Sequence, residues 1–473
     1  RPPTEPLTNI TNTVLLCCNN SSVTGSTVTP GTITTSSSPT ASTDSPFDDP
    51  AGFVFGESGD QNVIKCGSYT TNSNEDATVT LGWEPQWVMT KRIDANGDWR
   101  IYDSMRGLSD AQSVAANNGA SMILEPNDSA AEASSSKIGL TSTGFYADQD
   151  GGSRTYVYIA LRRPDGYVGK PPKLGTEVFA MDTGNSSSTI PALDSGFPVD
   201  FALGKYPATS DSWAATARLT GINYLVTDTS AAQASNQPKF VHDSNVGIWK
   251  DYDSTIQAWM WKRHTGFTTV AYEGDGVAGR QIAHDMNNSV GMIWIKNRDS
   301  TKDWVVGHIG LNGGTNPWEY HLVLNDNSAE AAHTTKGFND TAPTSTHFTL
   351  GSHSAVNAGG NSYIAMLFAS VDGISKVGYY DGSSTSSAQT ITTGFQPRFL
   401  MVKRINASGT SSSWINVDTT RGWVNGDDKV NYFNINAASE EYGMSYPIST
   451  GFVLDVDASF NMANNKYIYY AHA

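Results

Sequence analysis

Short apolar runs separated by polar turns recur along most of the chain, and their spacing predicts strands. Residues 99–102 alternate as a half-buried strand does. Residues 87–89 and 156–161 are apolar on both faces, so we expect buried strands, the second of them inside a sheet. Residues 94–98 have the composition of a hairpin loop. Short strands with Gly, Ser and Asn turns between them favour a β-sandwich.

The same ordered set of phrases occurs four times. Each copy has an apolar run that ends on a lysine, then a tryptophan, then an Ala-containing stretch, then an aromatic and apolar strand. The lysines are Lys91, Lys205, Lys296 and Lys403, and the tryptophans are Trp99, Trp213, Trp304 and Trp414. The Ala-containing stretches begin at Asn127, Thr227, Asn325 and Asn434. The period of roughly 100 residues is that of a domain rather than of a solenoid repeat.

These patterns predict an all-β protein of tandem β-sandwich domains with an extended N-terminal arm. We expect the arm or linker, rich in Ser and Thr, at residues 1–52, and the sandwiches at 53–166, 167–265, 266–372 and 373–473. Within the arm, residues 14–18 could form a strand. A helical turn is expected at each Ala-containing stretch, with Asp128 as the cap of residues 129–132.

The composition narrows the possible partners. The net charge of −16 argues against binding to nucleic acid, which needs a basic face. No apolar run approaches 18 residues, so no membrane insertion is expected. The chain shows no signal peptide and begins at Arg1, which suggests a processed product or part of a longer polypeptide. Cys17, Cys18 and Cys66 are expected as free thiols, and a bridge from Cys66 to either of the others stays open.

The repeated lysines and tryptophans each allow two interpretations. With the neighbouring Arg92 and Arg404, the lysines could form a site for acidic glycans, but we favour ion pairs between neighbouring strands. The same holds for Asp103 with Arg106 and for Asp418 with Arg421. The four repeated tryptophans could stack on sugars, but one large aromatic per unit is typical of a sandwich core. We therefore expect them in the core.

Tryptophans that do not align between the copies are the better candidates for exposed ligand contacts, because binding residues concentrate on variable loops. These candidates are Trp249, Trp318 and Trp423.

The sequence offers little for catalysis or metal binding. Asp-rich turns at residues 94–98 and 148–151 lack the closing Glu of a calcium loop. The nine histidines show no zinc spacing, and there is no nucleophile elbow or phosphate-binding Gly loop. We expect no enzyme activity, no catalytic residues, no metal and no cofactor.

The repeated phrases resemble tail-fibre and other virion surface proteins of marine, cyanophage-like tailed bacteriophages. The resemblance rests on Gly82 to Arg92 with residues 103–107, and on Gly394 to Arg404 with residues 418–422. Residues 312–351 and the stretch from Asp49 also carry it, and the second copy departs most. In such proteins these units accompany concanavalin-like lectin domains, which implies a lectin-like or jelly-roll-type sandwich that faces glycans.

The expected function is therefore that of a structural and adhesive part of a phage particle, a tail fibre or another appendage on the virion surface. Expected partners are copies of the chain itself in a homo-oligomer, by analogy a trimer, together with other virion proteins and a host-surface glycan. The alternatives are a purely structural or decorating virion protein, a polysaccharide depolymerase and a secreted bacterial adhesin.

Overall fold

The computed structural model describes residues 63–115, 121–149, 152–166, 168–185, 191–234, 240–242, 244–248, 254–333, 337–383, 387–426, 428–456 and 459–473, with short stretches at 11–13, 16–17, 26–28 and 32. Most of the expected N-terminal arm lies outside these residues. Within it, β1 (Leu16–Cys17) pairs with β2 (Ser26–Val28), so a strand does form inside the expected segment 14–18.

The first repeat consists of two antiparallel sheets. The main sheet has the order β3-β11-β5-β6-β7-β8, and the second sheet has the order β4-β10-β9. The elements are β3 (Ile64–Thr70), β4 (Asp76–Thr80), β5 (Pro85–Arg92), β6 (Trp99–Asp103), α1 (Ala111–Ala115), β7 (Ser121–Leu124), β8 (Ala133–Ser135), β9 (Ile138–Thr141), β10 (Gly144–Asp148) and β11 (Thr155–Arg162).

The second repeat is a smaller version of the first. Its main sheet has the order β12-β18-β14-β15-β16, and β13 pairs with β17. The elements are β12 (Phe179–Thr183), β13 (Leu193–Asp194), β14 (Phe201–Lys205), β15 (Ala214–Ala217), β16 (Leu225–Val226), β17 (Gly247–Ile248) and β18 (Gln257–Trp261), with 3₁₀ turns at Gly175–Glu177 and Arg218–Thr220.

The third repeat again has a six-stranded main sheet, β19-β26-β21-β22-β23-β24, and a pair β20-β25. The elements are β19 (Phe267–Glu273), β20 (Arg280–Ala283), β21 (Met292–Asn297), β22 (Val305–His308), β23 (Tyr320–Val323), β24 (Ala331–Ala332), β25 (His347–Leu350), α2 (Ser354–Asn357) and β26 (Ser362–Phe368), with 3₁₀ turns at Leu311–Gly314 and Pro317–Glu319.

The fourth repeat has the main sheet β27-β35-β29-β30-β31-β32 and a second sheet β28-β34-β33. The elements are β27 (Ser375–Asp381), β28 (Gln389–Thr392), β29 (Phe399–Arg404), β30 (Ile415–Asp418), β31 (Asp428–Tyr432), β32 (Glu440–Tyr442), β33 (Ser445–Ile448), β34 (Gly451–Leu454) and β35 (Lys466–His472), with 3₁₀ turns at Thr410–Ser412 and Thr419–Arg421.

The four main sheets share one strand order, in which the last strand of each repeat lies between the first strand and the strand that carries the repeated lysine. This confirms the expected all-β fold of tandem sandwiches and the inner position of residues 156–161. All four main sheets lie within the expected ranges of the repeats.

Each of the four repeats has an apolar core on the side of the main sheet that faces its second sheet or strand pair. In the first repeat, Val88, Tyr102, Phe145 and Tyr158 are buried there. Gly144 in β10 and Gly451 in β34 occupy the same place in their sandwiches, because a Cβ atom at either position would collide with a backbone carbonyl of the paired strand. Glycine is required there for the second sheet to form.

The Ala-containing stretches differ from expectation. Within the described residues, none of the four forms a helix. Asp128 accepts a hydrogen bond from the Ala130 N–H at 3.2 Å, which makes an Asx turn in place of a helix cap.

Candidate functional site

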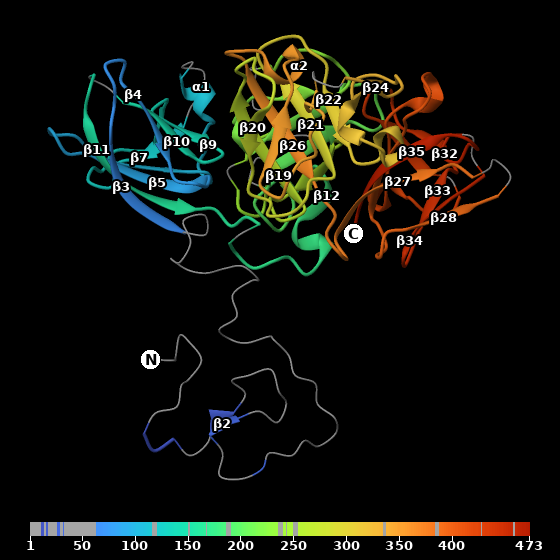
Figure 1. Ribbon diagram of the computed structural model, residues 1–473, viewed down its shortest axis with the longest axis horizontal. Helices are drawn as coiled ribbons and strands as arrows, with labels where there is room; N and C mark the ends of the chain where they lie inside the picture. Colours follow the sequence, from blue (N-terminus) through green and yellow to red (C-terminus); the bar gives the residue numbers. More distant parts are fainter. Residues whose placement is uncertain are drawn as a thin grey trace.

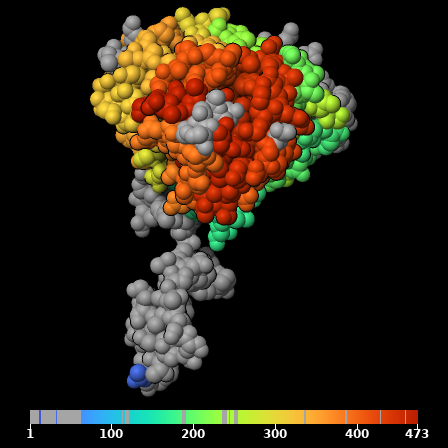
Figure 2. Space-filling view, turned by 90° about the vertical axis from the view of Figure 1, so that its right-hand side faces the viewer, coloured from blue at the N-terminus to red at the C-terminus, as the bar shows by residue number. Residues whose placement is uncertain are grey.

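Repeats two, three and four form a closed ring. Figure 1 shows the first repeat, blue to cyan, beside a larger body made by the other three. In Figure 2 the fourth repeat, orange to red, faces the viewer between the third in yellow and the second in green. The fourth repeat therefore contacts both of its neighbours in the ring.

The repeated tryptophans tie the ring together. Three of them are fully buried, and the ring nitrogen of each donates a hydrogen bond to a backbone carbonyl of a different repeat. The bonds run from Trp304 to Val226 at 2.8 Å, from Trp414 to Val323 at 2.8 Å and from Trp213 to Tyr432 at 2.7 Å. Repeat three thus binds repeat two, repeat four binds repeat three, and repeat two binds repeat four, so the cycle closes.

The core interpretation of the repeated tryptophans is therefore confirmed for three of them. It is wrong for Trp99 of the first repeat, whose side chain is 37% exposed. The first repeat lies outside the ring, and no neighbouring repeat covers this tryptophan in the described part of the chain.

The repeated lysines follow the same cycle. Lys296 donates to the Ser230 carbonyl at 3.1 Å, and Lys403 donates to the Ser328 carbonyl at 3.0 Å. Lys205 donates to the Asn436 carbonyl at 3.1 Å. Each of these lysines also binds a carbonyl of its own hairpin loop, at Lys302, Ser412 and Asp211 respectively. The lysines therefore bind carbonyls, and the expected ion pairs between neighbouring strands are wrong for them.

Burial perturbs these lysines. It lowers the pKa of Lys403 to about 7 and the pKa of Lys296 to about 8. The neutral amine keeps two N–H donors, which is enough for the two carbonyl bonds of Lys403. Lys296 also donates to the Asn297 carbonyl at 3.0 Å, so it loses one of its three bonds when the proton is lost.

The repeated aspartates and arginines do form ion pairs, but each pair joins residues three apart in the chain and not neighbouring strands as expected. Arg106 pairs with Asp103 at 2.6 Å, and Arg421 pairs with Asp418 at the same distance. The Arg421 guanidinium also lies 5.1 Å from the ring centre of Trp259 in the second repeat. In the fourth repeat the pair is thus part of the ring contact.

The carbonyls that accept from the three ring lysines lie on the Ala-containing stretches. From the sequence, these stretches were expected only to form helical turns. An Asn or Asp side chain at or next to the start of each stretch accepts a hydrogen bond from the main chain of its own repeated tryptophan. The pairs are Asn127 with Trp99, Asp228 with Trp213, Asn325 with Trp304, and Asn434 with Trp414. This side chain fixes the stretch so that its carbonyls face the next repeat in the ring. The recurrence of the stretch in all four copies was the signal that could have revealed it.

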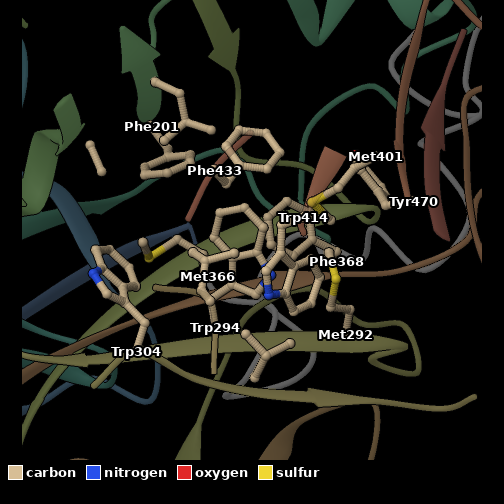
Figure 3. Close-up of a cluster of buried hydrophobic side chains, with 14 of the residues drawn as sticks. Phe201, Met292, Trp294, Trp304, Met366, Phe368, Met401, Trp414, Phe433 and Tyr470 are labelled. Atoms are coloured by element: carbon tan, nitrogen blue, oxygen red, sulfur yellow. The ribbon is translucent and has the colours of Figure 1, made fainter. Parts of the chain in front are cut away.

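A single apolar core fills the middle of the ring (Figure 3). It includes Phe201 from repeat two, Trp294 and Phe368 from repeat three, and Met401 and Tyr470 from repeat four. Aromatic rings meet across the boundaries, for example Trp213 with Phe433 and Phe368 with Tyr470. The main sheet of each ring repeat is thus buried on both faces.

Buried charges join the first repeat to the ring. Arg263 contacts Glu84 at 2.9 Å and Asp285 at 3.0 Å, which brings together repeats one, two and three. Burial raises the pKa of Glu84 above its usual range despite the nearby guanidinium. Burial also raises the pKa of Asp285, but Arg263 and the Thr268 hydroxyl outweigh burial and hold it below its ordinary value.

Two further contacts extend this junction. Arg298 contacts Asp110 at 2.9 Å, and Arg218 donates to the Ser104 carbonyl at 2.8 Å. Both arginines are buried, so the first repeat is held at a defined place on the ring.

Two open cavities of about 650 Å³ each flank this junction. Lys170, Lys262 and Glu177 line one of them, and Tyr146, Arg280 and His347 line the other. Of the tryptophans predicted as ligand contacts, the two that the structure describes, Trp318 and Trp423, line neither cavity.

The tryptophans proposed as exposed ligand contacts are not exposed where the structure describes them. Trp318 is 5% exposed and packs edge to face on Phe338, with the ring centres 5.3 Å apart. Trp423 is 1% exposed, and its ring nitrogen donates to the Ser445 carbonyl at 3.1 Å. Large aromatics on irregular segments fold back to close the sandwich cores, so the expectation of exposure is wrong for both. Trp249 lies outside the described residues.

Protein contacts hold the Asp-rich turn at residues 94–98. Asp94 pairs with Arg92, and Asp98 accepts from Asn127. Within the described part of the chain, no group of three or more His, Cys, Asp or Glu residues could hold a metal ion. Cys66 is exposed and free. Among the described helices, none is long and apolar enough to cross a membrane.

One protein family matches most of the chain. The family described as a domain of unknown function (DUF7483) matches residues 4–163 and 251–473. The unmatched segment covers most of the second repeat, which is also the repeat whose phrases and sheet depart most from the others. No curated protein matches the chain.

Proposed function

The chain belongs to the DUF7483 family, and we propose that it is a non-enzymatic structural and adhesive component of a bacteriophage particle. Its place is a tail fibre or another appendage on the virion surface. Its partners are other copies of the chain, other virion proteins and a host-surface glycan. The proposal starts from the resemblance of the repeated phrases to virion surface proteins.

The observation that carries this proposal is the closed ring of three equivalent sandwiches around one core. Symmetric appendages place equivalent units around an axis, and here a single chain does so with three of its own repeats. The buried hydrogen bonds and the shared core make the ring rigid, which suits a part that bears load. Repeated domains also favour multivalent contact over a single catalytic site.

A direct test is to locate the protein on particles. Gold-labelled antibody against the purified chain is expected to decorate the tail or another surface appendage of particles whose genome encodes it. Purified chain added to host cells beforehand is expected to lower particle adsorption severalfold, whereas an unrelated protein of similar size and charge leaves adsorption unchanged. Purified particles that contain none of the chain would refute the proposal.

The burial of Trp318 and Trp423 favours a second candidate, a purely structural or decorating virion protein. Two of the three tryptophans expected to make exposed ligand contacts are buried and cannot reach a ligand. This candidate predicts antibody labelling of particles together with unchanged adsorption, so the same pair of measurements separates the two functions.

A further inference from the structure

The first repeat has the strands and side chains that join repeats in the ring, but among the described residues no other repeat contacts them. We call the side of its main sheet that faces away from its sandwich core the outer face. Strand register places an apolar row across this face on five neighbouring strands, in the order Cys66, Ile159, Met89, Ile101 and Leu124. In the other repeats, the same face forms the core of the ring.

The equivalent rows confirm this correspondence. They are Met181, Trp259, Leu203, Ala215 and Leu225 in repeat two; Thr269, Met366, Trp294, Val306 and Leu322 in repeat three; and Val377, Tyr470, Met401, Asn416 and Asn431 in repeat four. All of these residues are buried except Met181, which packs against the shared core.

The outer face of the first repeat is open by comparison. Leu124 is 38% exposed, Ile64 at the edge is 50% exposed, and Met89, Ile101 and Ile159 are half-buried. An apolar surface that spans five strands is characteristic of an interaction site.

The first repeat also has the polar groups that join one repeat to the next in the ring. Asn127 holds the main chain of Trp99 at 2.8 Å, as its counterparts do in the ring. The Lys91 ammonium donates to the Gly97 carbonyl of its own hairpin at 2.7 Å. Among the described residues, neither the Trp99 ring nor Lys91 contacts the Ala-containing stretch of another repeat. The two donors and the stretch that would accept from them are therefore all present, and among the described residues none of them makes the contact between repeats that its counterparts make in the ring.

The first repeat contacts the ring through other surfaces. Asp110 and Glu84 make its buried ion pairs, and β9 packs near β19 of the third repeat. In Figure 1, β9 lies toward the ring, and β3 and β11 lie on the far side of the repeat. Among the described residues, the ring therefore leaves the outer face uncovered while the first repeat stays docked.

We propose that the outer face of the first repeat binds the outer faces of the first repeats of two further copies of this chain, which gives a homotrimer with a threefold axis at this repeat. The register fixes the contacts. In the ring, the carbonyl that accepts from the tryptophan lies two residues before the polar residue that holds that tryptophan's counterpart. Trp99 therefore donates to the carbonyl of Glu125 of the partner subunit. The carbonyl that accepts from the lysine lies two residues after that polar residue at Ser230 and Asn436, and three residues after it at Ser328. With the two-residue spacing, Lys91 donates to the carbonyl of Ser129 of the partner subunit.

A second and third copy fit this face better than other occupants, because the fold already shows the match. Three such faces close around one axis in the ring, with the same donors and the same acceptors each time. A face that supplies both halves of a contact is self-complementary, and the rotation seen in the ring closes after three units. The inference deepens the self-association named in the proposed function, but it depends only on the chain and not on a role in a particle.

The mass of the full chain in solution, measured by analytical ultracentrifugation at micromolar concentration, tests this inference. We expect three times the chain mass of 50.7 kDa. Met89→Glu places a charge at the centre of the outer face and is expected to give the monomer mass. Val277→Glu is the matched control, because Val277 is an exposed apolar residue (61%) on the third repeat, and this variant is expected to remain a trimer.

A second measurement keeps the test decisive if Met89→Glu lowers the melting temperature. Cys66 lies in the apolar row, so a maleimide should label it slowly in the trimer and at least tenfold faster in Leu124→Glu. Cys17→Ser and Cys18→Ser in every protein remove the other thiols. Leu124 lies at the end of the row, where a charge leaves the sandwich core intact.

Several results would overturn the inference. They are a monomeric or dimeric wild-type chain, or a trimer that both charged variants leave intact. A monomer with slowly labelled Cys66 would mean that another part of the same chain covers the face. Monomers that bind glycans through Trp99 would assign the face to sugar instead. Particle labelling and adsorption are measured separately, so failure of the trimer does not decide the proposed function.

Discussion

At the scale of single residues, equivalent side chains differ between the copies in their burial and in their hydrogen-bond partners. The four repeated lysines occupy equivalent strand positions, but Lys403 and Lys296 are almost fully buried, whereas Lys91 is half-exposed. The difference arises from what covers each hairpin. In the ring the next repeat supplies a carbonyl and removes water, so the charge becomes costly to keep.

This cost predicts a pH dependence of stability for Lys403. Burial lowers its pKa from 10.5 to about 7 in the folded chain, so the unfolded chain binds more protons between these values. The free energy of unfolding should therefore rise with pH across this window, by at most about 1.4 kcal/mol per pH unit from this group. Lys403→Met should flatten the rise, as measured by urea unfolding between pH 7 and 9.5.

Exposed Lys466, which pairs with Asp381, offers the matched control. Lys466→Met is expected to keep the wild-type slope. If Lys403→Met and the wild type gained stability equally with pH, the buried charge would not be the cause.

At the scale of elements, the Ala-containing loop is the part that joins one repeat to the next. An Asx side chain holds it against the tryptophan of its own repeat, and its carbonyls accept from the neighbouring repeat. The loop therefore couples the hairpin of one sandwich to that of another.

Replacement of a ring tryptophan should measure this coupling. Trp304→Phe leaves the carbonyl of half-buried Val226 without its donor, at a cost of about 1–3 kcal/mol beyond the loss of packing. Trp294→Phe is the control, because Trp294 lies in the same core and its ring nitrogen has no hydrogen-bond partner among the described residues. Equal losses of unfolding free energy in the two variants would show that the hydrogen bond adds nothing.

The sequence predicted the strands and the four sandwiches well, but it predicted the contacts between the repeats poorly. Alternating patterns and repeated phrases predicted four sandwiches and marked Trp213, Trp304 and Trp414 as core residues. They could not separate these from Trp99, because burial at this position depends on a neighbouring repeat rather than on local sequence. Trp318 and Trp423 were misplaced for a related reason, since segments that do not align between copies can still fold into their own cores.

At the scale of the whole molecule, buried charges join the ring of repeats two, three and four to the first repeat, which lies outside it. Asp285 of the third repeat and Glu84 of the first both contact Arg263, which follows the last strand of the second. Ion pairs of this kind add little net stability when complete, but they are costly to break because a buried charge is left unpaired.

Asp285→Asn should therefore lower the free energy of unfolding by about 3–5 kcal/mol. Asp275→Asn, in an exposed pair with Arg280, should lower it by less than about 1 kcal/mol. Because the pKa of folded Asp285 lies below its ordinary value, its contribution is present above pH 4 and is lost as the pH falls. The gap between wild type and Asp285→Asn should thus narrow in acid, and a gap that is constant with pH would contradict this assignment.

The strand order of the fourth repeat has a consequence for how the protein is made. β35 lies between β27 and β29 and carries Tyr470 of the shared core. The ribosome therefore completes repeats two and three before it synthesises β35. Repeat four needs this strand to complete its main sheet and to meet both neighbours. Until then, two sandwiches expose the apolar faces that the ring will bury, and the nascent chain is vulnerable to aggregation. Ring closure is consequently a late event in biosynthesis, and the last strand controls it.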